Sequence, residues 1–474
     1  MINLVWFRNN LRIHDNPPLA KAMKNGQCLC LYCFDEEQFG KTGFGFPKTG
    51  AIRAKFLIES VSNLRKNLRK MGGELIIRSG KTAEEICKLK QEFGIEAIYT
   101  PKEDISEELA IESEVAKAIG LPLLFESIQT LYHPDDIPFK LQSTPDVFTK
   151  FRKKIEKECT VRSTVQLPRE FDFTDVSDPG ELPELNDLGL RKQGIDPRAV
   201  LQFKGGEDEA LNRVQSYIWD GDHLKNYKFT RNGLTGADFS SKFSPWLANG
   251  SLSPGKIYEE VCRYENERKQ NISTYWMKFE LTWRDFFRFS AIRHGNDIFR
   301  HEGISGKEFT QSNDMDLFKK WAQGNTGIPF IDANMRELNS TGYMSNRGRQ
   351  NVASFLSQNL NIDWRMGASW FESRLIDYDV CSNWGNWAYN SAVGHDPRDR
   401  YFNIVHQAKK YDKKGEYVRL WLPELKNIPD KYIHEPWKAE SKQPDLFDNF
   451  SGIDYPQPVI DLDKSYEMIK ERSR

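Results

Sequence analysis

The first third of the chain alternates short apolar runs with amphipathic stretches. Apolar runs predict β-strands at residues 2–7, 27–34, 73–80, 96–100 and 121–127. Between them, helical periodicity predicts helices at residues 16–24, 50–70, 81–93 and 106–119. Strands that are apolar on both faces and alternate with helices predict a parallel sheet that is covered on both sides.

The pattern changes after this α/β segment. Residues 165–200 are rich in Pro, Asp, Glu and Gly and have weak periodicity, which is typical of a linker. Beyond Glu207 the periodicity is helical, and the Pro- and Lys-rich last 45 residues resemble a terminal extension. We therefore predict a doubly wound α/β domain at residues 1–135, a connector at 136–205 and an all-helical domain at 206–474.

Charge and composition narrow the function classes. Lys and Arg total 67 and Asp and Glu total 68, so the net charge is −1 and a nucleic-acid site must be a local basic patch. The seven cysteines have no zinc-ligand spacing, which favours structural thiols in a reducing compartment. No apolar stretch approaches the roughly 20 residues of a membrane span. The N-terminal sequence has no signal or transit composition, so we expect a cytoplasmic protein.

The most unusual stretch runs from Asp363 to Asn390. Buried indoles need a partner for their N–H group, so an ordinary core would use Leu and Ile instead. A tryptophan cluster beside polar groups indicates aromatic ligand stacking or electron transfer, and a Trp-rich helical core is the alternative. The stretch contains Trp364, Trp370, Trp384, Trp387, Asp377, Asp379 and Asn383.

Two further segments carry candidate ligand-binding chemistry. A serine-rich loop precedes an apolar helix, and helix starts offer free N–H groups to anions, although a serine-rich helix cap has the same composition. In residues 275–295, Glu280 and Trp283 share a helix face, which suits a polar aromatic ligand or a salt-bridged core helix. The first segment comprises Tyr227, Ser240, Ser241, Lys242, Phe243 and Ser244.

Residues 339–356 are rich in hydrogen-bond donors. A buried arginine must be paired, so Asp377 or Asp379 is the expected partner of Arg349. Arg347 is free to meet a phosphate. Solvated surface charges are the alternative interpretation for both arginines. The donors are Asn346, Arg347, Arg349 and Gln350.

Together these segments closely resemble the cryptochrome/photolyase family, and within it the DASH cryptochromes. The resemblance covers nearly the whole chain and rests on VWFRNNLRIHDN, FGFPKTGAIRAKFLIESVSNLRKNL, STYWMKFELTWRDFFRF, TGYMSNRGRQ and DYDVCSNWGNWAY, in that order. It implies FAD in the helical domain and a deoxyribodipyrimidine photolyase, which passes an electron from light-excited reduced FAD to a cyclobutane pyrimidine dimer. It also implies methenyltetrahydrofolate as an antenna, with Glu103 as the candidate contact.

The resemblance also implies roles for individual positions. Asn383 would face flavin N5, and Glu280 would hydrogen-bond the dimer. The other FAD contacts would be Tyr227, Ser240, Ser241, Lys242, Phe243, Ser244, Arg284, Arg349, Asp377 and Asp379. Trp283, Asn346, Arg347, Gln350 and Tyr389 would join Glu280 around the dimer.

The photoreduction chain of the family is matched only in part. Trp387 and Trp364 match its proximal and middle members, whereas the outer member falls at Gln311, which cannot be oxidised at useful potentials. Electrons would then enter at Trp364 or through another residue such as Trp321. We expect slower photoreduction than in a complete triad.

Two positions set the expected substrate. Gln350 and Tyr389 stand where duplex photolyases usually carry Met and Trp, so the pocket is more polar and recovers less energy from an extruded dimer. Because extrusion from a duplex costs about a few kcal/mol, we expect dimers in single-stranded DNA to be preferred. A blue-light photoreceptor that signals through a partner and a single-stranded nucleic-acid binding protein are the alternatives. We expect a monomer.

Overall fold

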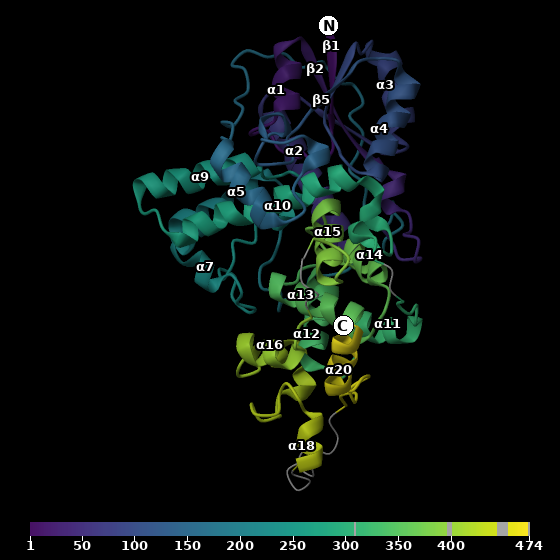
Figure 1. Ribbon diagram of the computed structural model, residues 1–474. Coiled ribbons are helices and arrows are strands. Elements are labelled where there is room, and N and C mark those ends of the chain that lie inside the picture. The colour runs from purple at the N-terminus through teal and green to yellow at the C-terminus, as the bar shows by residue number, and fades with distance from the viewer. Residues whose placement is uncertain (308–309, 396–400, 443–453, 473–474) are drawn as a thin grey trace.

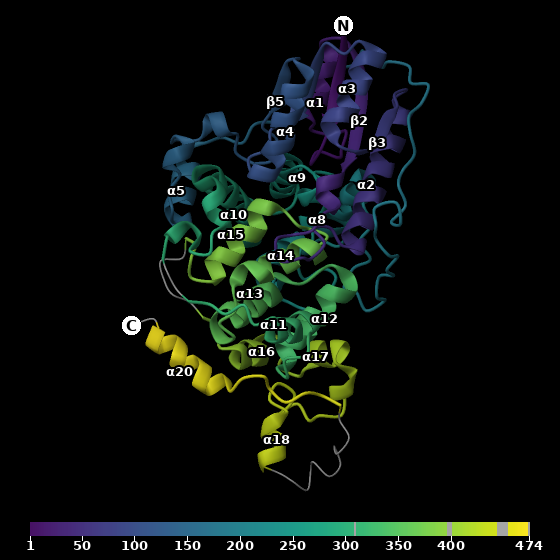
Figure 2. The same ribbon diagram turned by 90° about the vertical axis from the view of Figure 1, so that its right-hand side faces the viewer.

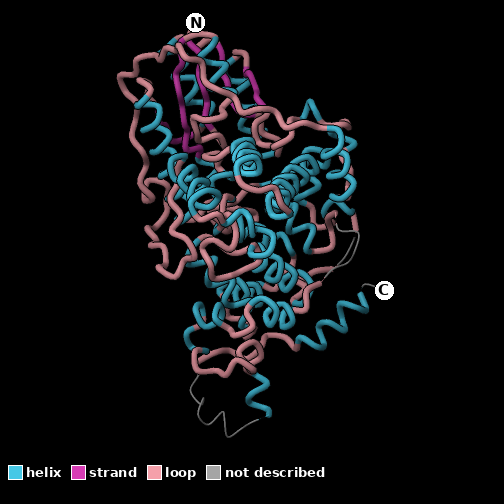
Figure 3. Tube along the Cα trace, turned by 90° about the vertical axis from the view of Figure 1, so that its left-hand side faces the viewer, coloured by secondary structure: helices cyan, strands magenta, loops and turns pink. Residues whose placement is uncertain are grey.

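The computed structural model describes residues 1–307, 310–395, 401–442 and 454–472. It confirms the predicted fold class, because the strands gather at the N-terminal end of the molecule and helices form the rest (Figures 1 and 3). The strands are β1 (Ile2–Phe7), β2 (Gln27–Asp35), β3 (Leu75–Gly80), β4 (Ala97–Pro101) and β5 (Leu123–Glu126). The helices are α1 (Pro17–Lys24), α2 (Ala51–Lys70), α3 (Thr82–Phe93), α4 (Ser106–Ile119), α5 (Phe148–Glu158), α6 (Glu207–Val214), α7 (Tyr227–Thr230), α8 (Ser244–Ala248), α9 (Pro254–Glu267), α10 (Ile272–His294), α11 (Met315–Gln323), α12 (Pro329–Thr341), α13 (Asn346–Ser354), α14 (Trp364–Arg374), α15 (Val380–Asn390), α16 (Ile404–Tyr411), α17 (Glu416–Trp421), α18 (Trp437–Lys442) and α20 (Leu462–Arg472).

The sheet is parallel and doubly wound. Its strand order is β3-β2-β1-β4-β5, so the chain leaves β1 toward one edge and returns to form the other edge. Val5 and Phe7 of β1 pack in one apolar cluster with residues of α1 and α2, whereas Leu4 and Trp6 pack in another with residues of α3 and α4. The loops after β1 and β4 diverge at the switch point between them, where such sheets bind ligands.

The connector wraps around the molecule rather than hanging free. The N–H of Cys28 donates to the carbonyl of Asp172 at 2.9 Å, and the N–H of Ile77 donates to that of Pro179 at 2.8 Å. Further on, Asp196 donates to the carbonyl of Ser340 at 3.3 Å. In Figure 2 this segment runs down the outside of the sheet past β3 toward the helices. The connector therefore fastens the α/β part to the helical part.

The helical part is built around α10. Asn271 caps this helix through the N–H groups of Ser273 and Thr274. The C-terminal helix α20 packs into the core, since Ser465 accepts a bond from Asn359 and the Tyr466 hydroxyl accepts one from the Ile404 N–H. The composition that indicated a terminal extension thus includes a core element. Among the described residues, no helix has both the length and the apolar character to cross a membrane.

Candidate cofactor and substrate site

A cavity of about 530 Å³ opens in the helical part, between α7, α10, α13, α15 and the loop before α8. Its lining includes most of the residues that the sequence singled out. These are Tyr227, Ser240, Ser241, Lys242, Phe243, Ser244, Glu280, Trp283, Arg284, Asn346, Arg349, Gln350, Asp377, Asp379, Asn383, Trp387 and Tyr389. Arg347, Trp364 and Glu103 do not line this cavity.

The serine-rich loop is held from behind by Arg213, which the sequence did not single out. Its guanidinium donates to the carbonyls of Ser241 at 2.9 Å and Ser240 at 3.3 Å. Lys242 adopts φ +55° and Phe243 returns to φ −75°. When the backbone passes from a left-handed to a right-handed conformation in this way, successive N–H groups point to one side and form a concave anion site. Burial lowers the pKa of Lys242 to about 8.

The Arg349–Asp377 ion pair, one of the two pairings expected for Arg349, is present at 2.8 Å. The second carboxylate oxygen of Asp377, Oδ1, is buried on the cavity wall and has no hydrogen-bond partner among the described residues. A buried acceptor without a partner is costly, so a ligand hydroxyl or N–H group fits here. The FAD ribityl and ribose hydroxyls are donors of this kind.

Asp379 has a different set of partners. It caps α15 through the Ser382 N–H at 2.8 Å and pairs with Arg288 at 2.7 Å. Burial alone would raise the pKa of Asp379, but the Arg288 and Arg284 guanidinium groups lower it to about 2. Arg284 donates to the carbonyls of Gln129 and Leu247. Asp379 is therefore a fixed negative charge on the cavity wall.

Asn383 is held in one orientation. Its side-chain nitrogen donates to the carbonyl of Ala368 at 3.0 Å, which identifies the nitrogen because a carbonyl only accepts. The amide oxygen is left as the acceptor for a ligand N–H. Trp387 lies buried beside it, and a Cβ atom on Gly367 would fall 2.2 Å from the Trp387 ring. Glycine at position 367 thus makes room for this indole.

Three of the expected dimer contacts, Glu280, Trp283 and Tyr389, form one corner of the cavity. Glu280 pairs with Arg231, a partner that the sequence analysis missed. Burial raises the pKa of Glu280 despite the opposing charge of Arg231. Trp283 stacks on Phe148 with ring centroids 3.6 Å apart, and Tyr389 meets Trp283 edge-on at 6.0 Å. A polar group therefore lies next to a flat aromatic wall.

Arg347 lies outside the cavity lining and belongs to its rim. It donates to Gln350 at 2.9 Å and to Asn232 at 3.2 Å. Its guanidinium also lies over the ring of Tyr411 at 4.6 Å. Arg347 therefore links Gln350 in the cavity to an aromatic residue outside it.

Trp387 and Trp364, the two tryptophans of the expected electron path, each contact another tryptophan ring. Trp387 meets Trp321 at 6.1 Å, whereas Trp364 meets Trp384 at 5.7 Å. Gln311 lies next to Trp364, because its side-chain oxygen accepts from the backbone N–H of Trp364 at 3.1 Å, whereas the Trp364 indole N–H donates to the carbonyl of His301 at 2.9 Å. An amide thus occupies the neighbourhood that the resemblance assigns to an outer aromatic donor.

A second cavity of about 470 Å³ lies at the switch point of the sheet, between the two parts of the chain. Its lining includes Arg8, Asn9 and Tyr378. Glu103 does not line it, but accepts a bond from the Asn9 side chain at 3.1 Å. Burial raises the pKa of Glu103 to about 7.

Comparisons with known proteins agree with this geometry. The family described as "DNA photolyase" matches residues 3–170, and the family described as "FAD binding domain of DNA photolyase" matches residues 276–474. Fold and site thus define a FAD-binding flavoprotein, and the chain belongs to the cryptochrome/photolyase family.

Within that family the chain belongs to the DASH branch. Curated proteins named Cryptochrome DASH are 51% identical in Gloeobacter violaceus, covering 98% of this chain and 93% of the relative, and 49% identical in Synechocystis, covering 98% and 96%. The crystal structure of a Synechocystis cryptochrome superposes with a TM-score of 0.95 at 48% identity, covering 99% of both chains. A bacterial class III photolyase from Agrobacterium tumefaciens gives 0.84 at 28% identity, covering 99% of this chain and 98% of that one.

Proposed function

We propose that this protein repairs cyclobutane pyrimidine dimers under blue light, with dimers in single-stranded DNA as the preferred substrate. One observation carries the proposal: the residues expected to bind FAD and the corner formed by Glu280, Trp283 and Tyr389 line the same continuous cavity. A ligand in that corner would lie beside the flavin without intervening protein. Bound reduced FAD would supply the light-excited electron and recover it after the cyclobutane ring has split.

The chain's own residues would position the cofactor. The concave backbone at Lys242 and Phe243 suits the pyrophosphate. Asp377 Oδ1 would accept from a sugar hydroxyl, which supplies the partner that this buried atom lacks. Asn383, fixed by Ala368, would present its oxygen to a protonated flavin N5. Each residue thus offers the group that the facing part of FAD needs.

Three side chains would recognise the dimer. Trp283, supported by Phe148, gives the apolar surface against which an extruded base packs. Because burial raises the pKa of Glu280, its acid form is more accessible than in a free glutamate and can donate to a base carbonyl. That hydrogen bond would stabilise the negative charge that the dimer gains. Tyr389 closes the corner edge-on.

The cavity rim supports the single-stranded preference. Lys228 lies over the Trp276 ring at 4.4 Å, and Arg347 lies over the Tyr411 ring at 4.6 Å. Phe229, beside Lys228, is 73% exposed. Trp276 and Tyr411 are half-buried. Aromatic rings beside cations are the usual platform for the stacked bases of single strands. The rim thus supplies the local basic patch that a net charge of −1 requires.

The second cavity is the proposed site of the methenyltetrahydrofolate antenna. Arg8 and Asn9 would face its polar groups, while Tyr378 and Trp384 give aromatic surface. Glu103 would act through Asn9, which it holds at 3.1 Å, instead of reaching the folate itself. Bound folate would be detected by its near-ultraviolet absorbance and by energy transfer to FAD, and both signals should weaken in Asn9→Ala.

The test uses the purified protein with chemically reduced FAD and a single-stranded oligonucleotide that carries one thymine dimer. We expect restored thymines under blue light and none in darkness, measured by chromatography of the digested strand. Dimer binding without light-dependent restoration, with the flavin confirmed as reduced, would refute repair. That outcome would favour a photoreceptor or a dark nucleic-acid binding protein, acting in the cytoplasm as the sequence predicts.

A further inference from the structure

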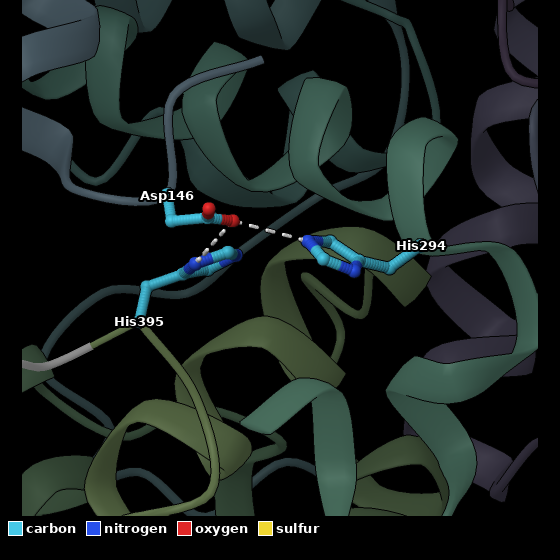
Figure 4. Close-up of side chains that lie close together, drawn as sticks. All are labelled: Asp146, His294 and His395. Atoms are coloured by element: carbon cyan, nitrogen blue, oxygen red, sulfur yellow. Dashed lines mark hydrogen bonds and ion pairs between the residues drawn. The ribbon is translucent and has the colours of Figure 1, made fainter. Parts of the chain in front are cut away.

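Three metal-ligating side chains meet away from both cavities (Figure 4). Asp146 precedes α5 in the connector, His294 is the last residue of α10, and His395 follows α15. Asp146 and His294 lie 148 residues apart in the sequence. The fold therefore brings together possible ligands from three separate segments of the chain.

The spacing of the three ligand atoms matches a tetrahedral metal ion. Asp146 Oδ1 lies 3.3 Å from His294 Nε2 and 3.7 Å from His395 Nδ1. All three atoms lie within 4.8 Å of one another. Zn²⁺ binds nitrogen and oxygen ligands at about 2.0–2.2 Å, and tetrahedral angles then place the ligands about 3.4 Å apart.

Nδ1 of His395 faces the centre, and the His395 ring also hydrogen-bonds the backbone of Asp146, a contact that a bound metal would replace. The other nitrogen of this ring, Nε2, contacts the Ser290 hydroxyl, and such a partner fixes the ring orientation of metal-binding histidines.

Within the described part of the chain, Arg293 competes with a metal for the Asp146 carboxylate. Arg293 donates to Asp146 Oδ1 at 2.9 Å, and it also donates to the carbonyl of Thr144. The guanidinium can keep Thr144 and move to the other carboxylate oxygen when a metal takes Oδ1. Asp146 is half exposed, which leaves room for this adjustment.

We propose that Asp146, His294 and His395 bind a divalent transition metal, for which Zn²⁺ is the best geometric fit, with water as the fourth ligand. The ion would tie the connector to the ends of α10 and α15. Asp146 lies two residues before Phe148, whose ring supports Trp283. Metal binding would therefore stabilise the aromatic wall of the cavity and the molecule as a whole.

The experiment is a calorimetric titration of Zn²⁺ into the chelator-treated, full-length flavoprotein at neutral pH. We expect one ion per chain and at least about tenfold weaker binding in His294→Gln, His395→Asn and Asp146→Asn. His406→Gln, at an exposed histidine of α16, is the matched control and should bind like the unaltered protein. Zn²⁺ should also raise the thermal midpoint of the unaltered protein and of the control only.

Three results would overturn the proposal. They are no stoichiometric binding by the unaltered protein, binding that survives both histidine substitutions, and equal weakening in the His406 control. Asp146→Asn keeps the test decisive if a histidine variant fails to fold, because this carboxylate is 53% exposed and its amide should not disturb the core. Unchanged affinity in a folded Asp146→Asn protein would also contradict the three-ligand site.

Discussion

Replacing Glu280 tests the assignment of the substrate corner. Hydrogen bonds to charged groups contribute about 1.5–3 kcal/mol and neutral ones about 0.5–1.5 kcal/mol. Because the acid form of Glu280 donates to the dimer, the bond is a neutral one, and its partly buried position places it at the upper end of the second range, about 1.5 kcal/mol. Glu280→Ala should then reduce the preference for dimer-containing over undamaged single strands by about tenfold. Glu280→Gln, which keeps a neutral hydrogen bond, should recover part of that loss.

The assay is fluorescence anisotropy in darkness, with labelled single strands that differ only by one thymine dimer. The ratio of the two dissociation constants isolates lesion recognition from general affinity for the strand. Repair per absorbed photon, measured on strands held saturated with protein, should fall further because the same bond stabilises the charged dimer. FAD content must remain equal among the variants, since Glu280 lies outside the set proposed to hold the cofactor.

Glu265→Ala is the matched control for this prediction. Glu265 pairs with Lys278 at 2.6 Å, and the two side chains are 11% and 21% exposed, compared with 27% and 21% for Glu280 and Arg231. It therefore removes a comparable half-buried ion pair at a glutamate outside the cavity lining. A dimer preference that stays within about twofold in Glu280→Ala, or that falls equally in Glu265→Ala, would refute the assigned role.

Three further predictions concern the cofactor site. Gln311→Trp should speed blue-light reduction of the flavin by an external thiol, followed by flavin absorbance, and an unchanged rate would exclude Gln311 as the missing outer position. Asp377→Asn should lower the FAD-to-protein ratio on purification, because it leaves Arg349 without its ion pair. Full retention of FAD would contradict the proposed contact between Asp377 and FAD. The pKa of Asp379 is lowered to about 2 in the folded protein. Its contribution to the free energy of unfolding is therefore fully present above the pKa of the unfolded state and is lost as the pH falls through about 2. The difference in unfolding free energy between the unaltered protein and Asp379→Asn should therefore be about 2 kcal/mol at neutral pH and should shrink between about pH 4 and 2, and a constant difference in acid titrations would refute it.

The sequence predicted those features that repeat along the chain or recur in motifs. Alternation of strands and helices was sufficient for the doubly wound sheet, and a buried arginine's need for a partner was sufficient for the Arg349–Asp377 pair. Arg213, Arg231 and Arg288 were not predicted. Arg213 and Arg231 lie outside the motifs and Arg288 lies inside one, but each has a partner at least 25 residues away, so no local spacing marks the pairing.

The position of Glu103 could not be obtained from the sequence for a related reason. Its motif follows β4 and lies in a loop at the switch point of the sheet. Whether a side chain in that loop faces the cavity or lies behind it depends on packing against the helical part. The structure places Asn9 on the cavity lining and Glu103 behind Asn9.

The most direct test of the central claim compares two substrates at equal occupancy. The reduced protein is saturated with the same thymine-dimer sequence as a single strand or as a duplex, and repair is followed under blue light. We predict efficient repair of the single strand and at least about tenfold slower repair of the duplex, because the polar lining at Gln350 and Tyr389 would return too little energy to offset extrusion. Equal rates in the two substrates would contradict the account, as would the absence of light-dependent repair in either.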